Sequence, residues 1–97
     1  MPAFWIAHVH VTDPERYGEY AKRATVAIAD HGGVFLARGG GCTQLEGPER
    51  ARNVVVRFES REDAVACYNS PAYQEALSYA RGASQRELVV VDALDDV

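Results

Sequence analysis

The stretch GGVFLARGGG, from Gly32 to Gly41, decides how this chain folds. Its five glycines bracket a short apolar run, which is compatible either with a phosphate-binding loop or with a strand between two flexible joints. A Walker-type loop needs a lysine followed by serine or threonine after its last glycine, whereas Cys42 and Thr43 follow Gly41 here. A dinucleotide-binding fingerprint places its glycines between a strand and the start of a helix. Because a helical pattern precedes the stretch and none follows it, the glycines predict a helix end, a strand at residues 34–38 and a turn.

Residues 4–11, FWIAHVHV, predict a strand because their side chains alternate between two faces. The cleaner core face carries Trp5, Ala7, Val9 and Val11, and the other face carries Phe4, Ile6, His8 and His10. The TDPE segment that follows matches a capping box, with Thr12 as the N-cap, Glu15 at its third position and Pro14 in the first turn. Apolar residues then recur at spacings of three and four, which predicts an amphipathic helix that ends at Gly32.

Two further strands are predicted after the glycine-rich stretch. The β-branched segment NVVVRF, residues 53–58, turns Val54, Val56 and Phe58 to one face and the alternate residues to the other. ELVVVDAL, residues 87–94, predicts the last strand.

The segment between these two strands predicts two helical pieces. Ser60 caps the first piece, Pro71 interrupts it, and Ser70 caps the second piece, which Gly82 ends. The order is therefore strand, helix, strand, strand, helix, strand within 97 residues. This order predicts an α+β fold, the ferredoxin-like βαββαβ sandwich, in which two helices cover one face of a four-stranded antiparallel sheet. Residues 1–97 are expected to form a single domain.

The uncovered face of that sheet predicts a homodimer. It carries Phe4, Ile6, Val55 and alternate residues of the last strand, and an exposed apolar face of this kind marks an interface. A second copy that packs sheet against sheet, related by a two-fold axis, supplies the missing cover.

Composition narrows the classes of partner and location. The net charge of −4 argues against nucleic acid, whose phosphates select a basic surface. No apolar run approaches the length of a membrane span, and the first ten residues lack the pattern of a signal peptide. Cys42 and Cys67 form no metal-binding or disulfide pattern, so a cytoplasmic protein with reduced thiols is expected.

Several motifs, taken in order, match one known family. They are VTDPERYGEY (Val11 to Tyr20), GGVFLARGG (Gly32 to Gly40), LEG (Leu45 to Gly47), RNVVVRFES (Arg52 to Ser60), YNSPAYQ (Tyr68 to Gln74) and Arg81. Through them the chain resembles the bacterial domain-of-unknown-function family 1330, of the dimeric α+β barrel superfamily. The resemblance implies a ferredoxin-like subunit whose two copies join their sheets into a barrel.

The resemblance implies no activity, because the superfamily includes cofactor-free monooxygenases, haem-degrading enzymes, decarboxylases, isomerases and plain binding modules. Where the family pattern has a glutamate just before the strand-ending phenylalanine, this chain has Arg57, and where a proline commonly follows, it has Glu59. No catalytic residue is therefore carried over from the family.

The candidate ligand-binding residues gather on the sheet face away from the helices. His8 and His10 point the same way along their strand, and the topology places Asn53 and Arg57 beside them. Such a cluster favours an anionic or enolate-like ligand, because guanidinium binds carboxylate in bidentate fashion. Arg38 fits either face of its strand and is a further candidate. The competing interpretation is that the histidines are partly solvated at the dimer contact and that the arginine forms ion pairs across it.

The remaining candidates are weaker. Tyr68 precedes the break at Pro71, where a helix end can border a cleft. The sequence around His8 and His10 offers no third metal ligand. Neither a metal nor a cofactor is therefore expected.

Two functions are compatible with these residues. In the first, a homodimer binds a small acidic or enolisable molecule in a pocket between sheet and helices and acts as a cofactor-independent oxygenase, isomerase or decarboxylase. A histidine then shuttles a proton while an arginine holds the oxyanion. In the second, the protein is a binding or assembly module without turnover. The sequence identifies neither a substrate nor a reaction, so it does not distinguish these two functions.

Overall fold

The computed structural model of the protein describes residues 1–96. The elements follow in the order β1 (Ala3–Val11), α1 (Pro14–Asp30), β2 (Val34–Arg38), β3 (Arg52–Phe58), α2 (Arg61–Asn69), α3 (Pro71–Ala80) and β4 (Ser84–Asp92).

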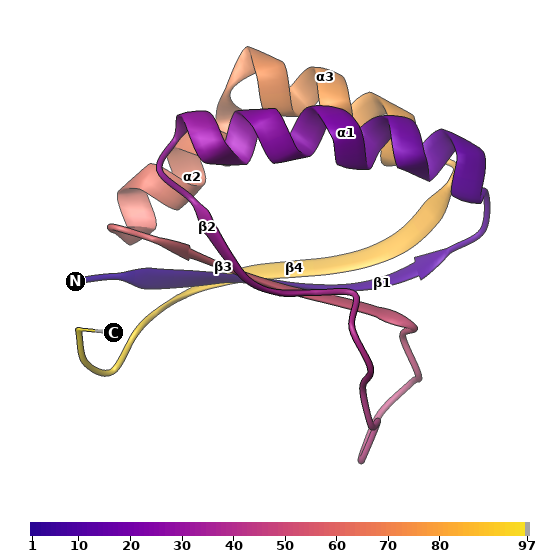
Figure 1. The fold of residues 1–97 in the computed structure, drawn as a ribbon, viewed down its shortest axis with the longest axis horizontal. Helices are drawn as coiled ribbons and strands as arrows, with labels where there is room; N and C mark the ends of the chain where they lie inside the picture. Colours follow the sequence, from indigo (N-terminus) through magenta and orange to yellow (C-terminus); the bar gives the residue numbers. More distant parts are fainter. Residues whose placement is uncertain (97) are drawn as a thin grey trace.

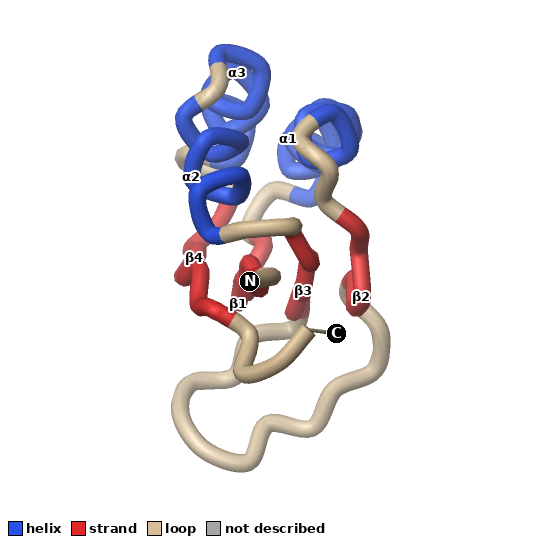
Figure 2. The backbone as a smooth tube through the Cα atoms, turned by 90° about the vertical axis from the view of Figure 1, so that its left-hand side faces the viewer, coloured by secondary structure: helices blue, strands red, loops and turns tan. Residues whose placement is uncertain are grey.

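The four strands form one antiparallel sheet in the order β2-β3-β1-β4, so that β1 and β3 are central. All the helices lie on one face of the sheet, with α1 and α3 side by side (Figures 1 and 2). This arrangement confirms the predicted ferredoxin-like sandwich. None of the helices within residues 1–96 is long and apolar enough to cross a membrane.

The core lies between the sheet and the helices and is rich in aromatic side chains. Trp5, Phe58 and Tyr73 are almost completely buried, and the Trp5 ring centroid lies 5.7 Å from that of Phe58 and 5.1 Å from that of Tyr73. The odd residues of β1 and the even residues of β3 face this layer, as the alternation predicts. Each of these side chains removes roughly 150–250 Å² from water, so together they contribute strongly to the core.

Local capping agrees with the prediction at two helices and corrects it at the first. Ser60 and Ser70 accept the expected backbone hydrogen bonds at the starts of α2 and α3. At α1 the N-cap is Asp13, whose carboxylate accepts from the Arg16 amide at 3.2 Å, and the predicted Thr12 cap is wrong. The Thr12 and Asp13 amides both donate to the Ala83 carbonyl, at 2.9 and 3.1 Å, and the first helical hydrogen bond runs from the Tyr17 amide to the Asp13 carbonyl.

The end of α1 and the start of β4 can each be compared with the prediction. The helix ends at the glycine pair as predicted, with Gly32 at φ 80°, and a Cβ on Gly33 would lie 2.5 Å from Cγ2 of Ile28. The last strand starts at Ser84, three residues before the predicted start at Glu87, because its pairing with β1 extends along the whole of that strand.

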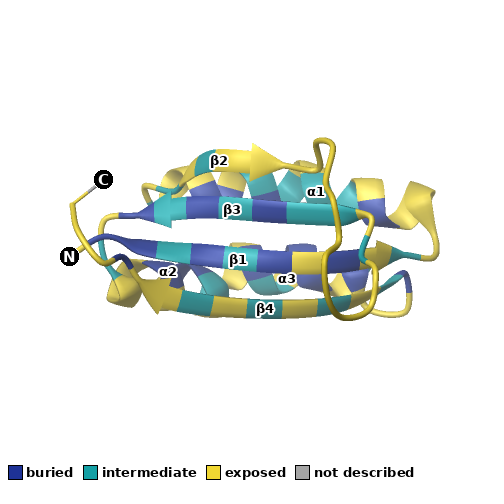
Figure 3. Cartoon of the chain, turned by 90° about the horizontal axis from the view of Figure 1, so that it is seen from below, coloured by how far each residue is buried: buried dark blue, intermediate teal, exposed yellow. Residues whose placement is uncertain are grey.

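The second sheet face carries no helix, and the loop between β2 and β3 crosses it at one end (Figure 3). Val34, Val89 and Val91 are about half exposed on it, next to the partly buried Phe4 and Ile6. The loop between β2 and β3 extends away from the helices on this side (Figures 1 and 2). Near its end, the Arg50 guanidinium forms two hydrogen bonds to the Glu87 carboxylate, at 3.0 and 3.1 Å.

Candidate anion-binding site

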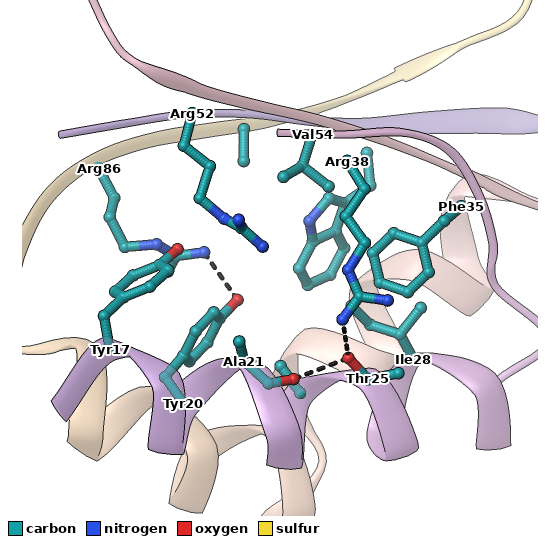
Figure 4. A pocket seen from close by; sticks show the side chains of 13 residues that line it. Tyr17, Tyr20, Ala21, Thr25, Ile28, Phe35, Arg38, Arg52, Val54 and Arg86 are labelled. Carbon is teal, nitrogen blue, oxygen red and sulfur yellow. Dashed lines mark hydrogen bonds between the residues drawn. The ribbon is translucent and has the colours of Figure 1, made fainter. Parts of the chain in front are cut away.

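A small pocket, partly open to solvent, lies between α1 and the sheet (Figure 4). Its apolar walls include Trp5 and Val54 from the sheet and Ala24 and Ile28 from the helix. Three arginines, Arg38, Arg52 and Arg86, extend into it from β2, β3 and β4. The pocket therefore combines an apolar lining with a concentration of positive charge.

Strand register brings Arg52 and Arg86 together. Both are paired with Val9 of the central strand β1, one from each side. Val9 is fully buried and faces the helices, so its two neighbours in the ladder face the same way. Two strand spacings separate their Cα atoms by about 10 Å, a distance that two long side chains can span.

Arg86 is held by buried phenol groups. Its Nη2 donates to the Tyr20 hydroxyl at 2.8 Å and to the Tyr73 hydroxyl at 3.3 Å, and the two hydroxyls lie 2.7 Å apart. The guanidinium carbon also lies 4.7 Å from the centroid of the Tyr20 ring. The Nε atom of Arg86 is buried and has no hydrogen-bond partner within residues 1–96.

Arg52 has fewer partners than Arg86. Its guanidinium carbon lies 5.8 Å from the centroid of the Tyr17 ring, and its Nε is buried without an acceptor among the described residues. Gly39 lies so close that a Cβ there would be 2.9 Å from Nη1 of Arg52. Gly39 therefore leaves room for this side chain, and its φ of 69° also favours glycine.

Arg38 occupies the other end of the pocket (Figure 4). Its guanidinium carbon lies 4.3 Å from the centroid of the Phe35 ring, and Nη2 donates to the Thr25 hydroxyl. Thr25 in turn donates to the Ala21 carbonyl of α1 at 2.7 Å. These contacts use part of the hydrogen-bonding capacity of the Arg38 guanidinium and hold the side chain beside α1.

None of these three arginines forms an ion pair within residues 1–96, although arginines elsewhere do. Arg23, Arg50 and Arg57 each have a carboxylate oxygen of Glu19, Glu87 and Glu59, respectively, within 3.0 Å. Like charges brought together in a partly buried site without a counter-charge raise the free energy of the folded state. The pocket is therefore complementary to an anion.

The titratable groups of the pocket favour binding of an anion over proton transfer. Burial raises the pKa of Tyr20 and of Tyr73, so both phenols are neutral hydrogen-bonding groups at neutral pH. Burial by itself lowers the pKa of Arg86, but the neighbouring tyrosines outweigh this effect and its pKa lies above the usual value. The described lining includes no histidine, carboxylate or cysteine.

The structure divides the predicted site residues between two faces of the sheet. His8, His10, Asn53 and Arg57 lie on the face away from the helices, as expected, and Nδ1 of His8 lies 2.6 Å from Oδ1 of Asn53. The sheet separates these histidines from Arg38, Arg52 and Arg86, so no histidine converges with the arginines of the pocket. The proton-shuttle role for a histidine has no support in this geometry.

Arg38 lies on the helix side and does not join that cluster. The register of β2 against β3 shifts between Phe35 and Ala37, and this irregularity reverses the facing of the residues that follow. Simple alternation from Phe35 would turn Arg38 to the other face, so the strand pattern alone could not place it.

Tyr68 packs in the core rather than in the pocket. Its ring centroid lies 6.1 Å from that of Trp5 and 5.4 Å from that of Tyr73. Part of it borders a separate hollow between α3 and β4, together with Arg81, Ser84 and the far side of Arg86.

Sequence reasoning missed Arg52 and Arg86, although a signal for both was present. Arg52 stands two residues before Val54, and Arg86 stands two residues before Leu88. If the strands are extended toward their starts, period-two alternation places both arginines on the core face.

No cluster of three or more histidine, cysteine, aspartate or glutamate residues able to hold a metal occurs among residues 1–96.

Fold and site together define a ferredoxin-like sandwich with a cationic pocket between its first helix and its sheet. The chain belongs to the DUF1330 family, a domain of unknown function, whose family model matches residues 2–94. No curated protein matches the chain.

Solved structures show the same fold. A protein of unknown function from Rhodopseudomonas palustris is 19% identical, with a TM-score of 0.78 over 98% of this chain and 84% of that one. A dimeric ferredoxin-like protein of unknown function from Jannaschia sp. is 12% identical, with a TM-score of 0.77 over 96% and 100% of the two chains. SnoaB, a cofactor-independent oxygenase from Streptomyces nogalater, is 11% identical, with a TM-score of 0.69 over 99% and 96%. At these identities the likeness establishes the fold alone.

Proposed function

We propose that this protein binds a small organic anion in the pocket between α1 and the sheet. The observation that carries the proposal is that Arg52 and Arg86 extend into one partly apolar pocket with buried Nε donors and no carboxylate partner within residues 1–96. A bound oxyanion accepts hydrogen bonds from the terminal nitrogens of these guanidinium groups, which are less buried than Nε, and offsets both the repulsion of the charges and their loss of hydration. The apolar walls contact the uncharged part of the same molecule.

Turnover of the bound molecule is part of this proposal. An arginine-lined pocket lowers the energy of an enolate or a similar anion, which is the species that a cofactor-independent oxygenase, isomerase or decarboxylase must stabilise. The structural likeness to SnoaB, described as a cofactor-independent oxygenase, supports the first of these reactions. Since the described lining holds no base that is active at neutral pH, the substrate reaches the pocket already ionised or is acidic enough to lose its proton to water.

The assembly belongs to the same proposal. The half-exposed valines of the open face support a homodimer that packs sheet against sheet, and two similar structures are described as dimeric. In that dimer His8, Asn53 and Arg57 serve subunit contacts rather than ligand binding. The alternative function is a binding or assembly module without turnover. A cytoplasmic location, which the two free cysteines support, completes the proposal.

Calorimetric titration with charged and neutral ligands of the same shape tests the proposal. The titrants are benzoate and benzamide, then hexanoate and hexanamide, at low salt so that screening stays weak. At least one carboxylate should bind more tightly than its amide, and Arg86→Gln should weaken that binding at least tenfold. Arg61→Gln is the matched control, since Arg61 is exposed on α2 and pairs with Asp92. Equal binding heats for the acids and their amides, or an equal loss of affinity in Arg86→Gln and Arg61→Gln, would refute anion binding in this pocket. Incubation of the protein with the carboxylate that binds, under dioxygen and under nitrogen, then distinguishes turnover from binding. A product indicates turnover, and its absence indicates binding alone.

A further inference from the structure

The cationic end of the pocket contains more unpaired charge than a single carboxylate neutralises. Arg52 and Arg86 extend from the sheet toward α1 and end near the Tyr20 hydroxyl, while Arg38 lies at the opposite end (Figure 4). Arg38 is exposed and is engaged with Phe35 and Thr25. The pocket therefore has a head end with two guanidinium groups and a second end with one.

A count of donors shows how much the head end offers. The guanidinium of Arg52 makes no hydrogen bond within residues 1–96, and that of Arg86 uses only Nη2, toward Tyr20 and Tyr73. Nε of each side chain is buried, so the donors open to a ligand are the terminal nitrogens of Arg52 and Nη1 of Arg86. A head group with several oxygens can contact both guanidinium groups at once.

Charge leads to the same conclusion as the donors. A singly charged ligand at the head end leaves one of the two partly buried guanidinium groups without compensation, whereas a doubly charged ligand compensates both. The neutral phenol of Tyr20 beside them adds no negative charge of its own. The whole chain has a net charge of −4, so the local excess of positive charge in the pocket does not follow from the overall composition.

We infer that the ligand of this pocket carries a doubly charged oxyanion head group, which binds between Arg52 and Arg86, while its uncharged part extends toward Ile28 and Phe35. The inference rests on the proposed function and adds the class of ligand. Phosphate monoesters and vicinal dicarboxylates share this chemistry, and the experiment distinguishes them.

Phenyl phosphate and phenyl sulfate form a matched pair, because both have a tetrahedral head on the same ring and differ in charge. Phosphate monoesters lose their second proton at a pKa of about 6, so phenyl phosphate is a dianion at about pH 7.5 and a monoanion at about pH 5. Calorimetry at the higher pH should show at least tenfold tighter binding of phenyl phosphate. The ratio should approach one at the lower pH and in Arg52→Gln, but not in Arg61→Gln. Phthalate against benzoate provides the same comparison for carboxylates.

The outcomes separate the two proposals. Equal binding of phenyl phosphate and phenyl sulfate, with phthalate no tighter than benzoate, refutes the doubly charged head and leaves anion binding intact. Failure of all four compounds, together with the carboxylates of the first test, refutes the proposed function itself. A preference confined to phenyl phosphate or to phthalate supports the inference and identifies the head group. The pH comparison uses the wild-type protein, so the test does not depend on whether a variant folds.

Discussion

Replacement of Arg52 by methionine should stabilise the unliganded protein and at the same time weaken its binding of anions. The guanidinium of Arg52 makes no hydrogen bond within residues 1–96, and its buried Nε lacks an acceptor. Methionine retains most of the apolar stem and fits irregular space, and it removes both the charge and the unpaired donor. A residue retained for ligand binding at the expense of stability is expected to behave in this way.

The magnitude follows from the geometry of the pocket. If the two guanidinium charges are as far apart as the Cα atoms of Arg52 and Arg86, about 10 Å, they repel each other by about 1.7 kcal/mol at an effective dielectric constant of about 20. Relief of an unpaired buried donor adds roughly 1 kcal/mol. Loss of the contact with Tyr17, 5.8 Å from the guanidinium carbon to the ring centroid, costs roughly 0.5–1 kcal/mol. Because Arg52 is only partly buried, solvent screening reduces the net gain to about 1 kcal/mol, which raises Tm by roughly 4–8 °C.

Urea unfolding at one fixed protein concentration measures the effect, since the stability of the proposed dimer would depend on concentration. Arg61→Met is the control and should change stability by less than about 0.5 kcal/mol, because its ion pair with Asp92 is exposed. Added salt should shrink the gain of Arg52→Met, because it screens the repulsion that the substitution removes. If Arg52→Met is less stable than the wild type by about 1 kcal/mol or more, Arg52 is a structural residue and the reasoning fails.

Three further predictions follow from single contacts. Gly39→Ala should weaken anion binding several-fold in calorimetry, because its Cβ would lie 2.9 Å from Nη1 of Arg52 and φ at this position is 69°. Gly40→Ala is the control, since its Cβ has open space, and it should bind anions as the wild type does. Equal affinities of the two variants would contradict this role of Gly39. Val91→Lys, on the open sheet face, should convert the dimer to monomer in light scattering, while the same change at the helix residue Val26 should not; two dimeric variants would place the interface elsewhere. Burial raises the pKa of Cys67 from 9.0 to about 11, so the folded state holds this proton more tightly and stability should fall as pH rises between those values. Urea unfolding of the wild type and Cys67→Ala across that range checks the slope, and the same slope in both would refute the assignment.

The two faces of the sheet serve different purposes in the proposed dimer. The face toward the helices contains the aromatic core and, at one end, the pocket with its arginines. The opposite face carries half-exposed valines and the polar cluster of His8 and Asn53. Because the pocket and the proposed interface lie on opposite faces of the sheet, ligand binding and dimer formation can be tested by separate substitutions.

The sequence by itself determined the order of the elements and the faces of the central strands. Alternation in β1 and β3 was sufficient to separate the Trp5 side from the His8 side, because side chains of a strand point to opposite faces with a strict period of two. The glycine pair after α1 ended the helix as expected, since glycine alone accepts positive φ without strain. The cap of α1 was misplaced by one residue, at a point where the Thr12 and Asp13 amides both donate to Ala83, which is distant in the sequence.

Only the tertiary structure decided where the site lies. Arg52 and Arg86 are 34 positions apart in the chain and become neighbours because β3 and β4 pair with β1 on either side of Val9. Arg38 reaches the same pocket because an irregularity in β2 reverses its facing, which no alternating pattern reveals. Strand register and bulges are set by long-range pairing and packing, and for that reason the local pattern specified the fold of this protein but not its pocket.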